Sequence, residues 1–188
     1  MKLKRFFDLS LSLIFILLFA PLFLIIFIII LIEIKGSAFH YSRRIGKNNK
    51  IFKMIKFKTM KDDTPDIATH LLDNPDHYIT KSGKFLRRTS LDELPQLFSI
   101  FCGKMSFVGP RPALHNQQDL INLRYKKNIH RLIPGLTGYA QINGRDNLTI
   151  EEKVHYDEYY LKNYSFYLDI KIILLTFVKL FKIKDVHH

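Results

Sequence analysis

The sequence lacks the features that mark secreted, repetitive or disordered proteins. Its 188 residues contain one cysteine and no tryptophan. A lone thiol cannot form an internal disulfide, so we expect the polar part of the chain to lie in a reducing compartment. Nothing around Cys102 suggests a metal ligand, and we predict a buried core thiol there. Internal repeats and low-complexity stretches are also absent, which excludes repeat architectures.

Acidic residues are scarce relative to basic ones. The chain has 29 Lys and Arg residues against 17 Asp and Glu, a formal net charge of +12. Phosphate groups are therefore the natural partners, on nucleic acid, anionic lipid or nucleotide, and charge alone does not choose among them. The length suits a single domain with a core of modest size.

Charged residues are missing from the long apolar run at 9–32. Only Ser10, Ser12 and Pro21 interrupt its apolar side chains, and the run is long enough to cross a bilayer. A cleaved signal peptide is excluded because the run is too long and no small-x-small site follows it before Glu33. We therefore expect a membrane element at the N-terminus.

The arrangement of this element in the bilayer has two readings. Pro21 lies near its middle and divides it into halves of about 12 residues, roughly 18 Å each, well short of a core of about 30 Å. Two half-helices that enter and leave by the same face fit this length, and so does one span with a proline kink. Basic residues flank both ends, which disfavours a simple span. They are Lys2, Lys4, Arg5, Lys35, Arg43, Arg44, Lys47 and Lys50.

The remainder of the chain, from residue 36, indicates a compact α/β domain, mostly helical with a small β element. The segment 51–60 is apolar and aromatic, and predicts a strand with Lys56 and Lys58 on one face. Further segments are an irregular stretch with one helical turn at 62–75, a helix in two pieces at 85–101 and a surface helix at 117–128.

The segment 165–184 is amphipathic. Lys171, Lys179 and Lys182 fall near one stripe of a helical wheel, which predicts an interfacial helix with its lysines toward lipid phosphates. A buried core helix is the alternative. A second membrane span is disfavoured because the charges recur too often.

Two adjacent acids, Asp92 and Glu93, stand in the segment RRTSLDELPQL. Ser90 and Glu93 have the spacing of a capping box, and Asp92 could itself cap a helix whose third residue is Pro95. Either arrangement puts the acids at a helix N-terminus, where the ionised carboxylate is favoured. A carboxylate nucleophile or metal ligand needs that state, although the acids could also serve only as caps.

Two arginine-bearing segments suggest a phosphate site. Arg111 lies between two prolines in SFVGPRP, so its backbone support should be stiff. The Gly-rich run at 134–145 predicts a flexible loop that presents Gln141, Asn143 and Arg145 as donors suited to phosphate. Together they indicate a phosphate-handling site near a membrane.

Five motifs in this order resemble the bacterial sugar transferases, the monotopic phosphoglycosyl transferases. The resemblance covers about residues 4–184 and fits the small form of the family. The motifs are KFKTM at 56–60, SLDELPQLF at 90–98, MSFVGPRP at 105–112, PGLTGYAQINGR at 134–145 and YDEYYLKN at 156–163.

The resemblance implies a reaction in two steps. Asp92 would attack the β-phosphate of a UDP-sugar, release UMP and hold the sugar phosphate covalently, with Glu93 assisting. Polyprenyl phosphate, as undecaprenyl phosphate in bacteria, would then take the sugar phosphate from the adduct. Such a transfer would be the first membrane step of glycoconjugate biosynthesis.

The resemblance also implies the ligands of the site. The family uses Mg²⁺, with Asp92 as its expected ligand. Asp157, in the tyrosine-rich motif, and Gln141 are further candidate substrate contacts. Basic positions of the motifs carry over as phosphate or nucleotide contacts: Lys58, Arg88, Arg111 and Arg145.

The family resemblance favours the re-entrant arrangement broken at Pro21. It implies a membrane anchor at 1–35 and a catalytic domain at 36–188, with its site on the cytoplasmic face of the bacterial inner membrane and in contact with its lipids. It leaves a homodimer open. A nucleic-acid binder is disfavoured because no helix-turn-helix or RNP-like signature is present. A lipid-binding scaffold would not require the adjacent acids, and the sequence does not identify the sugar or the pathway.

Overall fold

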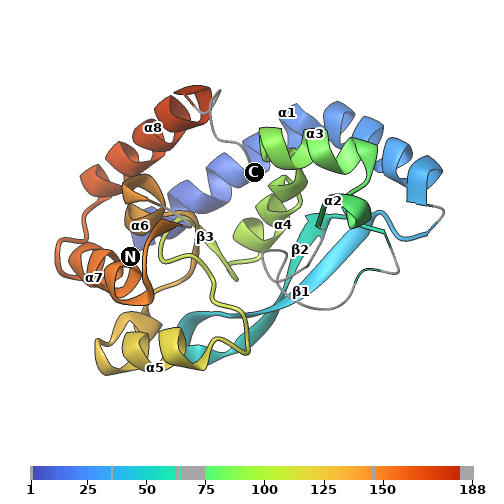
Figure 1. Cartoon of the computed structure of the whole chain (residues 1–188). Helices are drawn as coiled ribbons and strands as arrows, with labels where there is room; N and C mark the ends of the chain where they lie inside the picture. The colour runs from blue at the N-terminus through green and yellow to red at the C-terminus, as the bar shows by residue number, and fades with distance from the viewer. Residues whose placement is uncertain (1, 35, 62–63, 65–74, 145–146, 183–188) are drawn as a thin grey trace.

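The computed structural model describes residues 2–34, 36–61, 64, 75–144 and 147–182. Within these residues the chain is mostly helical, with two small sheets of two strands each (Figure 1). The predicted class, mostly helix with a small β element, is confirmed. Most of the irregular stretch at 62–75 lies outside the described residues, as does Arg145.

The first sheet is an antiparallel hairpin of β1 (Phe39–Ile45) and β2 (Ile51–Phe57), in which Phe39 pairs with Phe57. The strand predicted at 51–60 is confirmed over 51–57. The short 3-10 turn η1 (Lys47–Asn49) connects the strands and holds Asn48 and Asn49 at positive φ, which asparagine tolerates better than most residues.

The next segment carries the two acids between short helices. α2 (Pro75–Tyr78) precedes α3 (Lys81–Thr89), the 3-10 turn η3 (Leu91–Glu93) and α4 (Gln96–Phe101). The helix in two pieces predicted at 85–101 is confirmed, with its first piece starting at Lys81. Ser90, at φ 57°, ends α3 in the left-handed region and turns the chain into η3.

Cys102 is exposed, so the prediction of a buried core thiol is wrong. It is the C-cap residue of α4. The core side chains of α4 precede it, with Leu97 and Ile100 buried at 6% and 0% exposure. The chain leaves the core at the end of this helix, which exposes the thiol.

The second half of the domain is built on a parallel pair of short strands, β3 (Ser106–Val108) and β4 (Gly135–Thr137). Helix α5 (Gln118–Lys126) confirms the helix predicted at 117–128. The remaining elements are the 3-10 turn η4 (Ile129–Arg131), α6 (Tyr139–Asn143), α7 (Ile150–Lys162) and α8 (Phe166–Lys182).

The flexible Gly-rich loop predicted at 134–145 is instead strand β4 followed by helix α6. A Cβ on Gly135 would lie 2.1 Å from the backbone nitrogen of Gly109, and one on Gly138 would lie 2.1 Å from the carbonyl oxygen of Gly109. These glycines therefore permit a close approach of two backbone segments, which makes this region tightly packed.

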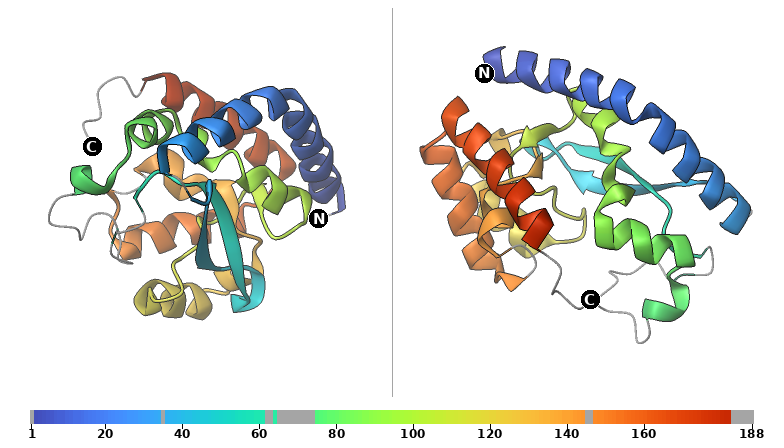
Figure 2. Two further views of the ribbon diagram at one scale, coloured as in Figure 1. Left: turned by 90° about the vertical axis from the view of Figure 1, so that its right-hand side faces the viewer. Right: turned by 90° about the horizontal axis from the view of Figure 1, so that it is seen from above.

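Helix α1 (Lys2–Ile34) is one continuous helix of 33 residues that contains Pro21. The predicted break into two separate half-helices is therefore not observed, although the helix axis changes direction along its length (Figure 2). An interior proline removes one hydrogen bond and bends a helix without having to end it. By length and composition, α1 could cross a membrane.

Both halves of α1 pack on the same domain. Phe7 and Phe15, in the first half, contact the core cluster that contains Ile100. Ile26 and Ile30, in the second half, belong to another cluster. The opposite side of the helix exposes many large apolar side chains, including Leu13, Ile14, Leu17, Leu18, Leu24, Ile25, Ile28 and Ile32.

A buried polar network holds the N-terminal end of α1. The Lys4 ammonium lies 2.8 Å from the Asp169 carboxylate and donates to the Val108 carbonyl oxygen at 2.9 Å. The Tyr160 hydroxyl donates to the same carboxylate at 2.5 Å. One turn along, the buried Asp8 accepts from the backbone N–H of Phe107 at 3.1 Å. We call Lys4, Tyr160 and Asp169 the Lys4 network; it ties α1 to α7 and α8.

The C-terminal end of α1 is attached to the first turn of α3. Glu33 accepts from the backbone N–H groups of Lys81 at 2.8 Å and Ser82 at 3.2 Å. A carboxylate at a helix N-terminus satisfies unpaired donors and the helix dipole. Both ends of α1 are therefore bonded to one folded domain.

Helix α8 buries Asp169 and Ile172 and exposes an apolar face. Lys171 is exposed, but Lys179 donates to the backbone carbonyl of Ile142. These two lysines of the predicted stripe therefore do not both face outward. Helices α1, α3 and α8 lie along the upper edge of Figure 1 and face the viewer in the right panel of Figure 2. The exposed apolar side chains of α8 include Tyr167, Leu174, Phe177 and Val178.

Candidate active site

Asp92 and Glu93 lie in η3, the turn that joins α3 to α4. The predicted capping box is wrong, because the side chain of Ser90 makes no capping hydrogen bond. Nor does Asp92 cap a helix whose third residue is Pro95, since Pro95 is itself the residue before α4. The carboxylate of Glu93 does not cap the turn because it meets cations from other elements.

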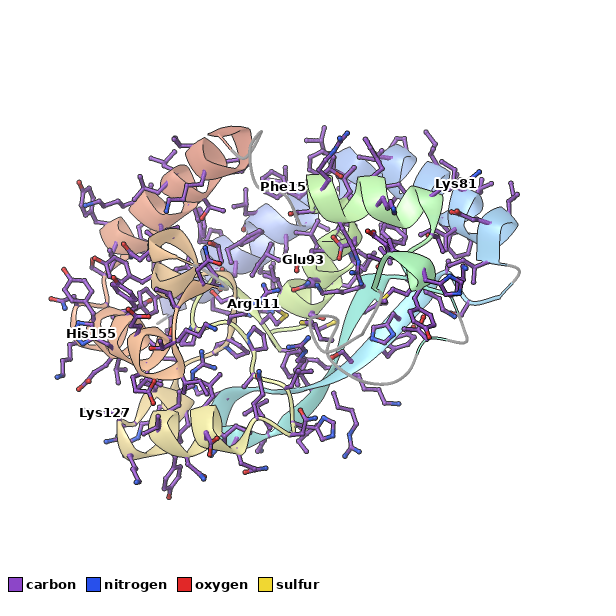
Figure 3. All side chains as sticks on the ribbon, viewed as in Figure 1. Phe15, Lys81, Glu93, Arg111, Lys127 and His155 are labelled. Carbon is purple, nitrogen blue, oxygen red and sulfur yellow. The ribbon has the colours of Figure 1, made fainter. Side chains whose placement is uncertain are left out.

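Those cations come from β2 and from the segment after β3. The Lys56 ammonium lies 2.6 Å from Glu93 Oε1 and 3.6 Å from Asp92 Oδ2. The Arg111 guanidinium lies 3.4 Å from Glu93 Oε1. Glu93 and Arg111 are close together near the centre of the molecule (Figure 3). We call these residues, Lys56, Asp92, Glu93 and Arg111, the acid-cation cluster.

Burial controls the charge of Asp92, whose residue is 9% exposed. Desolvation raises the pKa of its carboxyl, while Lys56 lowers it. This differs from the sequence-based expectation, in which a helix N-terminus would favour the ionised form. The nearby ammonium, supported by the Arg87 guanidinium, is what opposes protonation here.

The stiff support predicted for Arg111 is confirmed by three carbonyl contacts. Gly135 N–H donates to the carbonyl of Pro110 at 2.9 Å. Arg124 donates to the carbonyl of Arg111 at 2.8 Å, and Arg44 to that of Pro112 at 3.2 Å. Three successive carbonyl groups of this segment are thus hydrogen-bonded, while the side chain of Arg111 remains 35% exposed. Its guanidinium is thus oriented and still accessible.

The basic positions carried over from the motifs differ in their surroundings. Lys58 follows β2 and is half-buried, whereas Arg88 is exposed on α3. Arg87 is the arginine of α3 directed inward: it donates to the Thr59 hydroxyl at 2.9 Å and influences Asp92 electrostatically. Sequence reasoning missed Arg87, and it placed Lys56 on the strand without including it in the site.

Gln141 and Asp157 occupy contrasting positions. Both amide atoms of Gln141 are buried and make no hydrogen bond within the described part of the chain. Asp157 is 1% exposed and binds Arg124, with Nη2 at 2.6 Å and Nε at 3.0 Å. Its carboxylate is therefore enclosed in this structure and bound to Arg124 through Oδ2, in contrast to the exposed substrate contact that its predicted role requires.

An apolar groove of about 360 Å³ adjoins the chain just after the two acids. One of its walls includes Leu94, the residue after Glu93, and another is the bent part of α1. Phe15, on this wall, is marked in Figure 3. The lining residues are Phe15, Ile16, Phe19, Ala20, Phe23, Leu24, Phe27, Phe39, Leu94, Leu97 and Phe98.

The metal chemistry of the site depends on two carboxylates. Among the described residues, no group of three or more His, Cys, Asp or Glu side chains is arranged to hold a metal ion. Asp92 and Glu93 offer oxygen ligands of the kind Mg²⁺ takes from proteins, which usually supply one or two carboxylates while substrate phosphates and water complete the shell. The donor set fits Mg²⁺ bound together with a phosphorylated substrate.

Comparison with known proteins gives a consistent result. A protein of Bacillus subtilis named as an uncharacterized sugar transferase, EpsL, is 38% identical over 177 residues, which cover 94% of this chain and 86% of EpsL. The UDP-glucose:undecaprenyl-phosphate glucose-1-phosphate transferase of Escherichia coli is 38% identical over 184 residues, 94% of this chain and 40% of that protein.

An undecaprenyl-phosphate galactose phosphotransferase of Salmonella typhimurium is 33% identical over 192 residues, 93% of this chain and 39% of that protein. The chain thus spans about two fifths of these longer relatives. The pattern of the family described as bacterial sugar transferase matches residues 1–183. From the extent of this match and from the relatives, we conclude that the chain belongs to the bacterial sugar transferase family.

Proposed function

We propose that this chain transfers a sugar 1-phosphate from a UDP-sugar to undecaprenyl phosphate and releases UMP. One juxtaposition carries the proposal: a buried carboxylate, Asp92, is held beside Lys56, and two residues further along the chain Leu94 lines an apolar groove against α1. The cations suit the pyrophosphate of the donor, and the groove suits the hydrocarbon chain of a lipid acceptor. The relatives named above act on such substrates by name.

In the proposed first step, a carboxylate oxygen of Asp92 attacks the β-phosphorus of the donor. A new phosphorus–oxygen bond forms, the bond from this phosphorus to the bridging oxygen breaks, and the electron pair leaves with UMP. In the second step an oxygen of undecaprenyl phosphate attacks the same phosphorus and releases Asp92. Division into two displacements is the usual advantage of a covalent nucleophile.

Phosphoryl transfer depends mainly on positioning and charge neutralisation, which the neighbours of Asp92 provide. Lys56 opposes the rise in pKa that burial causes, and so favours the ionised nucleophile. The guanidinium of Arg111 is partly exposed and can bind a phosphate through two nitrogen atoms. Glu93, between the two cations, has the role of holding both in place.

Asp92 would contribute a ligand to Mg²⁺ in the loaded site, with Glu93 close by. The ion, bound with the donor, would neutralise phosphate charge. We assign Gln141, whose buried amide atoms lack partners among the described residues, to the recognition of a polar group of the donor.

The attachments of α1 support a placement in the membrane. A helix that crossed the bilayer would carry its two ends to opposite sides, yet Lys4 and Glu33 bind the same domain. We therefore infer that α1 enters and leaves by one face, the cytoplasmic face of the inner membrane, where nucleotide sugars are made. The exposed apolar faces of α1 and α8 would contact lipid there.

A UMP-release assay tests the function. Detergent-solubilised protein is incubated with Mg²⁺, undecaprenyl phosphate and each of a panel of UDP-sugars, beginning with UDP-glucose and UDP-galactose. We expect UMP and lipid-linked sugar with at least one donor. A scaffold or a nucleic-acid binder would release none, so the absence of UMP across the panel would refute the proposal.

A further inference from the structure

The backbone carbonyl of Arg111 is bound by Arg124, which forms a buried ion pair with Asp157. We infer that Arg124 and Asp157 are positioning residues for Arg111 in the transfer reaction, acting through its backbone and without touching the substrate. This inference rests on the proposed function. It also gives Asp157 a role that its burial permits.

The backbone of Arg111 is bound directly by Arg124. Its neighbours, Pro110 and Pro112, have no N–H group, so this segment can be held mainly through its carbonyl oxygens. The carbonyl of Arg111 itself accepts from Arg124 Nη1 at 2.8 Å. Arg124 therefore fixes the peptide unit that directly follows the Cα atom from which the Arg111 side chain extends.

Arg124 is in turn held by Asp157. Its Nε and Nη2 atoms both donate to Asp157 Oδ2, at 3.0 and 2.6 Å. The side chains of Arg124 and Asp157 are 12% and 1% exposed. Each nitrogen of the guanidinium therefore has a fixed partner, so the fork cannot turn away from the carbonyl of Arg111.

The ion pair of Arg124 and Asp157 is better explained by the positioning of Arg111 than by the stability of the fold. A buried ion pair is weak support for a fold, because well-packed apolar side chains of similar size usually stabilise as much or more. Apolar residues could hold α5 against α7 in this way, but they could not bind the carbonyl of Arg111. The contacts run without a gap from Asp157 through Arg124 and Arg111 to Glu93.

Two variants separate positioning from stability. Arg124→Lys keeps a positive charge for Asp157, but an ammonium lacks the fork that spans both partners. The double variant Arg124→Leu and Asp157→Leu removes the ion pair altogether, and keeps the question testable if the lysine variant fails to fold.

Lys127→Gln is the matched control. It breaks a partly exposed ion pair, 3.2 Å long, between Lys127, the C-cap residue of α5, and Glu158 of α7. Lys127 lies at the outer end of α5, far from Arg111 in Figure 3. Its loss should therefore leave the acid-cation cluster unchanged.

The first readout is a double-mutant cycle on kcat/KM for UMP release. We expect Arg124→Lys and the double leucine variant to lose between about tenfold and about a hundredfold, as small misplacements of catalytic groups do. Added to Arg111→Ala, Arg124→Lys should cost nothing further, whereas an independent structural role would multiply the losses. Wild-type activity in Arg124→Lys, or multiplied losses, would overturn the inference.

The second readout does not need turnover. Amide hydrogen exchange over residues 106–114 should be faster in Arg124→Lys than in the wild type, and unchanged in Lys127→Gln. If the wild type releases no UMP from any donor, the proposed function fails and exchange alone decides. Faster exchange then supports the attachment of the Arg111 backbone to Arg124, and unchanged exchange overturns it.

Discussion

Two clusters of charged side chains among the described residues, the Lys4 network and the acid-cation cluster, contrast with each other. In the Lys4 network the side chains of Lys4 and Asp169 are 12% and 3% exposed, and the carboxylate has both an ammonium and a hydroxyl as partners. In the acid-cation cluster Arg111 is 35% exposed. The first cluster is closed and attaches a helix, while the second is open on the side of its arginine.

The two clusters also differ in charge balance. Lys56 and Arg111 match Asp92 and Glu93 in number, and Arg44 and Arg87 lie close enough to influence the cluster electrostatically. The surplus of positive charge suits an anionic ligand. Enclosure and charge balance therefore distinguish the Lys4 network from the acid-cation cluster, even though both use the same residue types.

Removal of the proposed nucleophile should have the largest effect. Asp92→Asn keeps the shape of the side chain but cannot form the acyl phosphate, so we expect UMP release to fall by at least about 10⁴-fold. The thermal unfolding midpoint should stay near that of the wild type. Intact-mass measurement after incubation with donor alone should show added sugar phosphate on the wild type only. Full activity in this variant would refute the assignment.

Opening the closed cluster should affect stability. Lys4→Met leaves the Asp169 carboxylate buried without its ammonium, which should cost about 3–5 kcal/mol of unfolding free energy. Denaturant unfolding in detergent measures this loss. The control is Lys2→Met, because Lys2 is exposed on the same helix and its replacement should change stability by no more than about 0.5 kcal/mol. Equal losses in both variants would remove the distinction between the clusters.

Within the open cluster, Lys56→Met should change the pH dependence. The reaction needs ionised Asp92, so activity falls as the pH drops through the pKa of its carboxyl. Lys56 lowers that pKa, and its loss should move the acidic limb of kcat/KM to higher pH, with a lower maximum. Lys53→Met, at an exposed position of the same strand, is the control. An unmoved acidic limb would show that Lys56 does not set the charge of Asp92.

The smallest effect should follow from Pro21→Ala. The variant restores one backbone hydrogen bond and reduces the bend, yet both ends of α1 remain attached to the domain. We therefore expect the N-terminus to stay on the same side of the membrane. Accessibility of a cysteine introduced at Lys2, in a Cys102→Ser background, tests this placement. Labelling from the opposite face would show that the attachments do not determine topology.

Local patterns predicted α1, β2, the helical segment of α3 and α4, α5 and α8, but not β1, β3, β4, α6 or α7. The apolar run predicted α1, and the period of two predicted β2. The resemblance pointed to Asp92, Glu93 and Arg111 as site residues. In the structure Glu93 lies beside Arg111, and Asp92 lies beside Lys56. Short-range periodicity was sufficient for α1 and β2, because the pattern that predicts each element lies within its own residues.

The failures have a common physical cause. The capping box was lost because Glu93 meets Lys56, 37 residues away in sequence. The pairing of Arg124 with Asp157 bridges 33 residues and has no local signature. The glycines at 135 and 138 were interpreted as flexible because the partner backbone at Gly109 could not be seen. Charge partners and close approaches are decided by tertiary packing, which a single sequence does not display.

The Lys4 network also has a consequence for biosynthesis. Lys4 precedes its partner Asp169 by 165 residues, so a ribosome releases α1 well before the carboxylate that receives it. A chain interrupted ahead of α8 leaves the lysine ammonium without that carboxylate. The Lys4 network therefore forms only after α8 has been synthesised, whereas the attachment of Glu33 to α3 does not depend on α8.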